Sequence, residues 1–415
     1  MKSGIVKKTT SYIMGIPMND ADVNTPEMVY ERIRASEEFE LLKVEFDDKN
    51  ICPMVTVGYR DMEFLVDIRI ESVDAIAPDF MFCHPIPDEC IKKIKQAQIG
   101  VTTFLTFNDD ILASHHFQLK FLKCIVPELA AVVDFNVRRI FSPVWLKQFA
   151  DSKAAPGPGY IFSINSAPDK NGNNWMFTQG LNRCGFMELE VLNAPTDNLD
   201  FYGNILSITG SKAITENVFP DEMERFDIAS LPGGKSLSVT WRYWKGEVSV
   251  YGDEILGSAK NRPKNTPFNG MLFVWDIENN SKKPVRASDM TPFSIENAVV
   301  EFSPEENRRI EILSQETIDL FRRGFDIPET RALVKIKMKL SEKTDEDGSY
   351  EYVWAEVDSL DKENVFGTAI QDSAVSDTVK KDEKIQASLS SVSDWILNIK
   401  GGRVTPDTSF MLAEK

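Results

Sequence analysis

Residues 54–70 read MVTVGYRDMEFLVDIRI, two runs in which apolar and polar residues alternate on either side of Arg60-Asp61. Alternation with a period of two is typical of strands that bury one face. Because only two residues separate the runs, the stretch predicts a tight β-hairpin. The alternation also occurs just upstream, in residues 39–46, so the first part of the chain contains an antiparallel region of sheet.

Helical segments are interleaved with strands around this hairpin. Further strands are predicted at residues 11–17, 101–107 and 130–140. Helices are predicted at residues 26–36, 87–98, 111–126 and 143–149. Thr25 is the expected N-cap of the first helix, with Pro26 at its first helical position, and Gly100 is expected to stop the second. This mixture predicts an α+β lobe over residues 1–150, a mixed sheet with helices packed on it.

The loop AAPGPG at residues 154–159 precedes a second group of elements. Strands are predicted at residues 160–165, 175–179, 236–244 and 271–277, and a helix at 196–216. Asn171-Gly172 is the expected turn between the first two of these strands. We therefore predict a second α+β lobe over residues 160–300, packed on the first.

A third unit is predicted from Ser303-Pro304 onward. This pair has the pattern of an N-cap followed by the first helical residue, opening a helix through Phe321 that ends at Gly324. Strands follow at residues 333–340 and 350–357, with a hydrophilic turn at 345–348. The sequence thus predicts a small β-rich domain over residues 303–415, led by a helix. The fold class as a whole is α+β.

The net charge of −17 and the isoelectric point near 4.8 limit the partners that the chain can attract. A phosphate backbone would be repelled, so no nucleic acid is expected. Residues 301–415 hold 16 Lys and Arg against 24 Asp and Glu, which makes this part the more acidic per residue. Acidity of this kind favours solubility, and it also predicts a basic protein partner.

The same composition predicts a cytoplasmic protein. The N-terminal residues lack the unbroken apolar segment of a signal peptide, and no run is long and apolar enough for a membrane span. The five cysteines are odd in number and scattered, which favours free thiols in a reducing compartment over a disulfide framework.

Motifs that suggest metal or phosphate chemistry fail on spacing. His115 and His116 are adjacent, whereas a helical metal pair needs residues three or four apart. Cys83-His84 with Cys90 has no second ligand pair to complete a zinc site. Residues 230–236, SLPGGKS, end in Gly-Lys-Ser but precede a strand instead of the helix that a phosphate loop requires. No cofactor and no metal are therefore predicted.

Cys184, Glu188 and Glu190 are the remaining candidates for chemistry. A cation such as Arg183 lowers the pKa of a neighbouring thiol, and paired carboxylates can act as acid and base. Against this, no histidine follows Cys184 in the sequence, and a buried free cysteine is the commoner situation. Both alternatives stay open at this point.

Two stretches of the chain resemble uncharacterised bacterial families. The C-terminal pattern consists of ALVKI (332–336), EYVWAEV (351–357), Gly367-Thr368, SDW (393–395) and Gly401-Gly402 before Thr405. It resembles the small YegJ-like domain. Upstream, QGLNRCGFMELE (179–190) resembles the end of another bacterial domain-of-unknown-function family. The resemblance implies a bacterial cytosolic protein and brings no substrate, cofactor or catalytic residue with it. Related small acidic families include immunity proteins that act beside toxins.

Within the YegJ-like pattern, Trp354, Asp394 and Trp395 are candidate contacts for a partner or ligand. Tryptophans in a small β domain either anchor its core or form an aromatic patch for binding, and the sequence leaves both open. Because no nucleophile–base set is evident, the sequence favours a non-catalytic binding protein of unknown ligand. The alternatives are a hydrolase or transferase that uses carboxylates or Cys184, and an immunity-type protein that binds a basic toxin.

Overall fold

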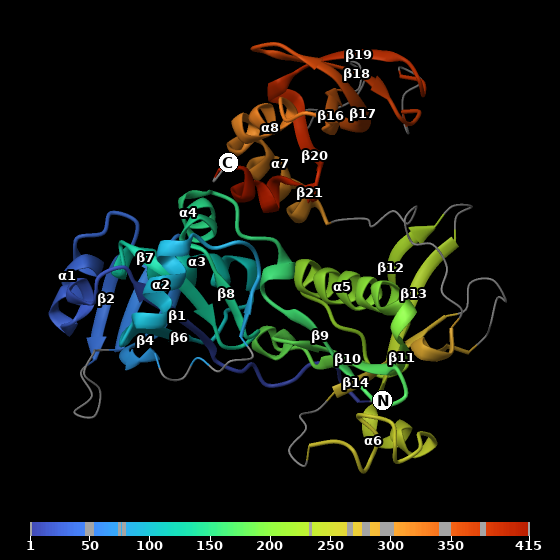
Figure 1. Ribbon diagram of the computed structural model, residues 1–415, viewed down its shortest axis with the longest axis horizontal. Helices are drawn as coiled ribbons and strands as arrows, with labels where there is room; N and C mark the ends of the chain where they lie inside the picture. The colour runs from blue at the N-terminus through green and yellow to red at the C-terminus, as the bar shows by residue number, and fades with distance from the viewer. Residues whose placement is uncertain are drawn as a thin grey trace. The chain divides into compact units, whose positions relative to one another are not determined.

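The computed structural model describes residues 2–45, 54–73, 76, 80–231, 235–263, 269–275, 283–290, 303–339, 350–373 and 379–413. The chain divides into two compact units, the first formed by Met1–Pro143 with Pro156–Ser303 and the second by Val144–Ala155 with Pro304–Lys415. Over the described residues the fold is α+β with three sheets, as the sequence predicts, and the last sheet lies in a β-rich C-terminal unit (Figure 1).

The first sheet has eight strands in the order β2-β3-β4-β6-β1-β7-β8-β5. They are β1 (Ser11–Pro17), β2 (Glu40–Glu45), β3 (Met54–Tyr59), β4 (Met62–Ser72), β5 (Met81–Phe82), β6 (Ile99–Leu105), β7 (Leu129–Asp134) and β8 (Arg139–Phe141). Neighbours run antiparallel except β5 and β8, which are parallel, so the predicted mixed sheet is confirmed. The predicted hairpin joins β3 to β4, with Arg60 in the left-handed region at φ 55°.

Helices cover both faces of this sheet. They are α1 (Pro26–Arg34), α2 (Asp88–Gln96) and α3 (Ile111–Ile125). Met14 and Ile16 of β1 pack with Cys90 of α2, whereas Gly15 points the other way, toward Leu122 of α3. The predicted cap of α1 is confirmed, because the amide of Met28 donates to Thr25 Oγ1 at 3.4 Å.

Two local predictions in this region are wrong. Gly100 does not stop α2 but lies in β6, where a Cβ would come within 2.5 Å of the Met14 sulfur. The single strand predicted at residues 130–140 is two strands, β7 and β8. Asp134 Oδ1 accepts the amides of Asn136 and Val137 at 3.0 and 3.4 Å, and these bonds turn the chain between the strands.

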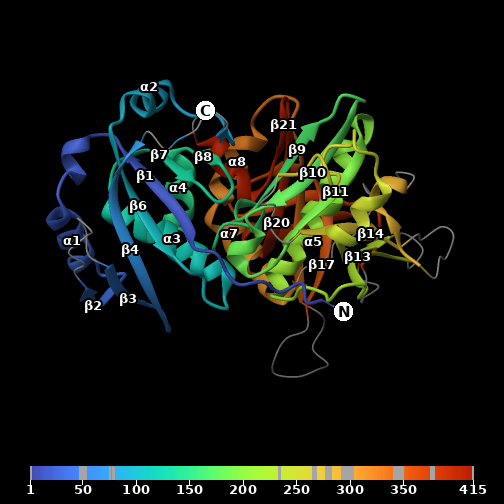
Figure 2. The same cartoon turned by 90° about the horizontal axis from the view of Figure 1, so that it is seen from below.

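The second sheet of the first unit has seven strands, six of them in the order β12-β13-β14-β11-β10-β9, with β15 paired to β14. They are β9 (Ser163–Pro168), β10 (Asn173–Gln179), β11 (Glu188–Pro195), β12 (Phe226–Leu231), β13 (Lys235–Tyr243), β14 (Asn269–Val274) and β15 (Val285–Arg286). α5 (Leu199–Glu216) lies along it (Figure 2). The short α6 (Trp244–Glu247) follows β13. β12 and β13 pair antiparallel, with Leu231 opposite Lys235, so Lys235 and Ser236 of the Gly-Lys-Ser sequence open a strand as predicted.

The chain enters the first sheet from the second. The amide of Val6 donates to Gly185 O at 2.8 Å, and the amide of Met187 donates to Gly4 O at 3.0 Å. The residues before β1 are therefore hydrogen-bonded to the segment that leads into β11 of the second sheet. The division of this region into two packed lobes, residues 1–150 and 160–300, stays a prediction.

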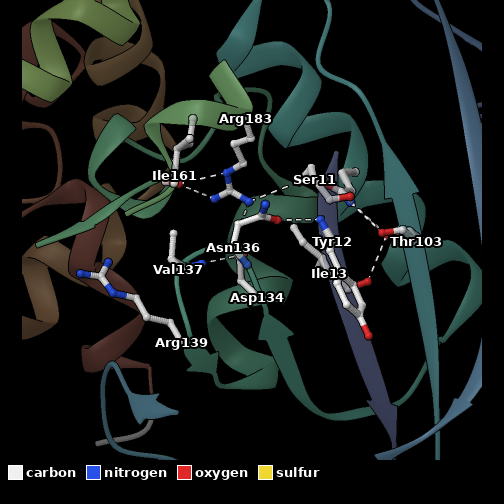
Figure 3. A network of polar contacts seen from close by, with 12 residues as sticks. Ser11, Tyr12, Ile13, Thr103, Asp134, Asn136, Val137, Arg139, Ile161 and Arg183 are labelled. Carbon is white, nitrogen blue, oxygen red and sulfur yellow. Dashed lines mark hydrogen bonds and ion pairs between the residues drawn. The ribbon is translucent and has the colours of Figure 1, made fainter. Parts of the chain in front are cut away.

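A buried ion pair joins the two sheets of the first unit. Arg183 Nη1 lies 2.8 Å from Asp134 Oδ2, and both side chains are almost completely buried. The remaining guanidinium hydrogens are used as well: Nε donates to Ile161 O at 3.0 Å and Nη1 to Ser11 Oγ at 3.2 Å (Figure 3). Each partner comes from a different segment, so one side chain holds four parts of the chain.

The sheet of the second unit has six strands in the order β19-β18-β17-β16-β20-β21, all antiparallel to their neighbours. They are β16 (Arg331–Lys339), β17 (Tyr350–Leu360), β18 (Asn364–Ala369), β19 (Lys384–Ser388), β20 (Val392–Ile399) and β21 (Gly402–Val404). The predicted leading helix is two helices, α7 (Pro304–Glu316) and α8 (Ile318–Phe325). They break at Thr317, whose hydroxyl donates to Leu313 O at 2.6 Å, a contact that bends helices. The predicted 345–348 turn lies outside the described residues.

A helix from the first half of the sequence completes the second unit. α4 (Pro143–Asp151) and the residues after it contact elements more than 150 positions away. Gln148 donates to Pro406 O at 3.2 Å in the terminal 3-10 helix η9 (Pro406–Leu412), and Arg309 Nη1 donates to Ala155 O at 3.1 Å. Arg309 also pairs with Asp407 at 2.7 Å. The described helices of both units are each too short or too polar to span a lipid bilayer.

The ion pair predicts a large loss of stability when its cation is removed. Arg183→Met leaves the Asp134 carboxylate buried without a counter-charge, which should lower the free energy of unfolding by about 3–5 kcal/mol. Denaturant unfolding followed by tryptophan fluorescence measures it. Lys260→Met, which removes an exposed partner of Asp253, is the control and should cause no measurable loss. Equal small losses in both variants would contradict the assigned importance of Arg183.

Candidate functional site

The sheet of the second unit brings two of the predicted site residues together. Lys335 of β16 is paired in register with Trp354 of β17 on one side and with Asp394 of β20 on the other. Side chains of directly paired residues point to the same face, so the three form a row across the sheet. We name this surface the Trp354 face and define it by Lys335, Lys337, Tyr350, Tyr352, Trp354 and Asp394.

On the Trp354 face, the lysine side chains of β16 lie beside the aromatic side chains of β17. Lys335 Nζ lies 4.9 Å from the centroid of the Tyr352 ring, and Lys337 Nζ lies 4.7 Å from that of Tyr350. These are cation–π distances. Burial lowers the pKa of Lys335, which also donates to Asn307 Oδ1 of α7 at 3.3 Å. Tyr350 is 47% exposed and Trp354 is half-buried, so the face is open to a ligand.

Asp394 has an unusual titration for an aspartate. Burial raises the pKa of its carboxyl to about 6, although the amide of Trp395 donates to Oδ1 at 2.7 Å and Lys335 lies nearby. A carboxyl that changes charge close to neutral pH is the kind of group found at functional sites. The arrangement offers one partly desolvated anion beside one partly desolvated cation.

Trp395 points to the opposite face. It pairs in register with Val334 and is completely buried, with its ring centroid 5.4 Å from that of Phe321 of α8. Of the two alternatives for Trp395, the structure places it in the core. Adjacent residues of a strand face opposite sides, so Asp394 and Trp395 could not both belong to one patch.

A cleft lies beside the Trp354 face, between α7 and the strands β16 and β17. Its volume is about 810 Å³, and it is open to solvent. The lining includes Arg308 and Glu311 of α7, Lys337 of β16 and Tyr352 of β17. The cleft thus extends the Trp354 face toward α7.

Cys184 is not available for chemistry in this conformation. It lies at the end of the 3-10 turn η4 (Leu181–Cys184), 2% exposed, and burial raises the pKa of its thiol to about 12. The charge of Arg183 lowers the pKa of the thiol, but the guanidinium itself binds Asp134 and Ile161. A thiol with this pKa holds its proton at neutral pH and is a poor nucleophile.

Glu188 shapes the turn that carries Arg183. Its Oε1 accepts the amides of Gly180 and Asn182 at 2.8 and 3.1 Å, and its Oε2 accepts the Thr178 hydroxyl at 2.8 Å. Gly180 has φ 113°, a left-handed conformation that glycine adopts without strain. Burial raises the pKa of Glu188, while these three hydrogen bonds lower it. The carboxylate holds η4 in place.

Glu190 is also buried, in a saturated polar cluster. Arg262 contacts both its oxygens, at 2.6 and 3.0 Å, and the Trp175 indole and the Asn269 amide each donate to Oε2 at 3.2 Å. The Arg262 guanidinium also lies 4.2 Å from the Trp244 ring centroid. Both oxygens of Glu190 are thus engaged by buried donors, which makes the carboxylate a poor base for a substrate.

Sequence reasoning missed the partners that the buried acids require. Arg262 lies 72 positions from Glu190, and Asp134 lies in a strand that the sequence merged with its neighbour. One physical signal was available: a buried carboxylate needs a cation or several hydrogen-bond donors, so each buried glutamate of the strand implies partners of one of these two kinds.

A serine–histidine contact also occurs in the first unit, between Ser142 Oγ and His84 Nε2 at 2.8 Å. The backbone amide of Ser142 donates to the same nitrogen at 2.8 Å, and Ser142 is 1% exposed. Burial lowers the pKa of His84 to about 4. A nitrogen occupied by an amide donor is a poor general base, so this contact fastens the segment before α4. Within the described residues, no group of three His, Cys, Asp or Glu side chains is arranged to hold a metal ion.

Three regions of the chain match models of known families, and each of these models describes proteins of unknown function. Residues 11–156 match the N-terminal model, and residues 161–273 the C-terminal model, of the protein of unknown function DUF4026. Residues 313–406 match DUF2314, an uncharacterized protein conserved in bacteria. The chain is therefore a bacterial domain-of-unknown-function protein, with DUF4026 followed by DUF2314. No curated protein and no solved structure matches it. The YegJ-like name for the C-terminal part stays a prediction.

The titration of Asp394 predicts a pH dependence of stability. Its folded-state pKa of about 6 lies above the ordinary 3.8, so the stability linked to its proton is present below about pH 4 and is lost as pH rises through 6. Asp394→Asn keeps the acceptor for Trp395 and removes the titration. Relative to the unsubstituted protein, the variant should gain at most about 3 kcal/mol of unfolding free energy between pH 4 and 7.

Denaturant unfolding across this pH range measures that difference. Asp358→Asn is the control, because Lys384 lowers the pKa of the Asp358 carboxyl below its ordinary value, so that carboxyl stays charged over this pH range and its substitution should cause a difference that is constant with pH. A difference for Asp394→Asn that stays constant with pH would show that the carboxyl titrates normally.

The burial of Cys184 predicts that it resists alkylation. Iodoacetamide at about pH 8 should modify the exposed Cys83 slowly in the folded protein, because burial raises the pKa of its thiol to about 11, and should leave Cys184 unmodified until denaturant is added. Site-resolved mass spectrometry measures both residues in one sample. Rapid modification of Cys184 under native conditions would favour the thiol-dependent alternative.

Proposed function

We propose that this protein is a non-catalytic binding protein whose contact surface is the Trp354 face. The observation that carries the proposal is the row of Trp354, Lys335 and Asp394 on an open sheet face. Aromatic side chains supply contact area at low entropic cost, and a partly desolvated charge beside them supplies orientation. The bacterial family to which the chain belongs supplies no activity that competes with this proposal.

The surroundings of the other candidates support binding over catalysis. Cys184 holds its proton, Glu188 fastens a turn, and Glu190 is paired with Arg262. The hydrolase or transferase alternative requires at least one of these groups to reach a substrate. We therefore place the function in the second unit.

The nature of the partner rests on charge. The net charge of −17 favours a basic protein, and an immunity-type role against a basic toxin is one form of that prediction. Both stay predictions, as does the cytoplasmic location. The Trp354 face itself carries lysines, so its local sign differs from that of the chain.

Truncating the central aromatic side chain should abolish binding while leaving the fold intact. Full-length tagged protein is incubated with lysate of the source bacterium, and bound proteins are quantified by mass spectrometry. Trp354→Ala should reduce the recovery of specific partners by at least about tenfold, the effect of removing an aromatic anchor. The reason is lost contact area, since no other side chain of the row offers as much.

The control is Leu65→Ala, which truncates a 54% exposed side chain on β4 of the first unit. It should leave recovery unchanged. If both variants retain every enriched protein, or if nothing is enriched by the unsubstituted protein, the proposed function is rejected.

A further inference from the structure

The cleft beside α7 differs in charge from the rest of the molecule. Three basic residues line it, Lys153, Arg308 and Lys337, against two acidic ones, Glu311 and Glu316. In a chain with 17 more acidic than basic groups, a lining with a basic majority marks a local reversal of sign. Opposite potentials at an interface favour encounter and select the partner.

Both acids of the lining already accept hydrogen bonds within the protein, and Glu311 is also paired with a cation. Glu311 accepts two hydrogen bonds from Lys337 Nζ, at 2.8 and 3.0 Å. Glu316 accepts the Ser152 hydroxyl at 2.5 Å and the Lys153 amide at 3.0 Å. Their oxygens thus offer little to a cationic ligand.

Two of the three basic residues of the lining lie at the protein surface. The side chains of Arg308 and Lys153 are exposed at the edges of the cleft. A guanidinium can meet a carboxylate through two parallel hydrogen bonds, which adds specificity to the charge attraction. The cleft therefore favours a ligand that carries carboxylates.

Aromatic surface continues from the cleft along β17. Tyr352 lines the cleft, and Trp354 and Tyr350 lie two residues to either side of it on the same face. Successive side chains on a strand face are separated by about 7 Å, the spacing that an extended peptide repeats on each of its own sides. A ligand of extended backbone fits this row.

We propose that the cleft and the Trp354 face together bind an extended acidic segment of a partner protein. Its carboxylates meet Arg308 and Lys153, while Lys337 stays paired with Glu311, and its apolar side chains lie on Tyr352 and Trp354. This inference rests on the proposed function and names the ligand class for that same surface. A single-stranded nucleic acid also combines anions with flat apolar groups, but a long phosphate backbone would meet the overall charge of −17. A short peptide with a few carboxylates carries fewer negative charges and is repelled less.

Fluorescence anisotropy with the full-length protein tests the inference. The probes are short labelled peptides in which leucine alternates with glutamate, with glutamine or with lysine, and a labelled oligothymidylate of similar length. The glutamate peptide should bind, and the glutamine peptide should bind at least about tenfold more weakly, the loss expected when charge-assisted contacts become neutral. Added salt should weaken the binding of the glutamate peptide, because the contacts lie near the surface.

Arg308→Glu should weaken binding of the glutamate peptide by at least about tenfold. Arg323→Glu is the matched control: it reverses the same charge at an exposed position of α8 and lies outside the cleft lining, so it should leave the affinity within about twofold. Tyr352→Ala tests the aromatic floor and should also weaken binding. Circular dichroism of each variant checks that the unit is folded.

Equal effects of Arg308→Glu and Arg323→Glu would overturn the inference, as would equal binding of the glutamate and glutamine peptides or binding of no probe. Tighter binding of the lysine peptide would overturn it in favour of a basic partner, and tighter binding of oligothymidylate in favour of a nucleic acid. Recovery of Trp354-dependent partners from lysate without binding of the glutamate peptide would leave the proposed function standing and remove only the ligand class.

Discussion

The contact between Arg183 and Asp134 is the constraint on which the first unit depends. A guanidinium removed from water needs a counter-charge and acceptors for its other hydrogens, and here these come from β1, β7 and the segment before β9. The requirement acts in both directions. Asp134 also turns the chain between β7 and β8, so the position of Arg183 is linked to the path of the chain from β7 to β8.

The turn that presents Arg183 shows how one polar group supports another. The Glu188 carboxylate accepts hydrogen bonds from the amides of Gly180 and Asn182. Gly180 and Gly185, both left-handed, allow the chain to reverse direction tightly. Glu188 thus fixes the geometry of the turn that carries Arg183. Residues that suggest catalysis by their identity act here through their hydrogen bonds.

Local patterns were sufficient for most of the elements. The hairpin at residues 54–70 and the helix that begins at Pro26 follow from alternation and capping, which need only neighbouring residues. The division of 130–140 into two strands and the break at Thr317 depend on single side-chain hydrogen bonds to the backbone, which periodicity does not reveal. The Glu190–Arg262 pair spans 72 positions and has no local signature. At the candidate site, the sequence brought out Trp354 and Asp394, but only the strand register shows that Lys335 lies between them and that Trp395 faces away.

The placement of α4 has a consequence for how the chain is divided and inherited. The helix lies within the span matched by the DUF4026 N-terminal model, yet it folds as part of the unit that holds DUF2314. Its hydrogen bonds to Pro406, and those of the residues after it to Glu316 and Arg309, connect the two family regions without a peptide link. A protease cut near Ser303 would therefore leave the C-terminal fragment attached to the rest of the chain. For the same reason, recombination that exchanged the C-terminal region alone would leave α4 without its packing partners, a cost in stability that favours inheritance of the two regions together.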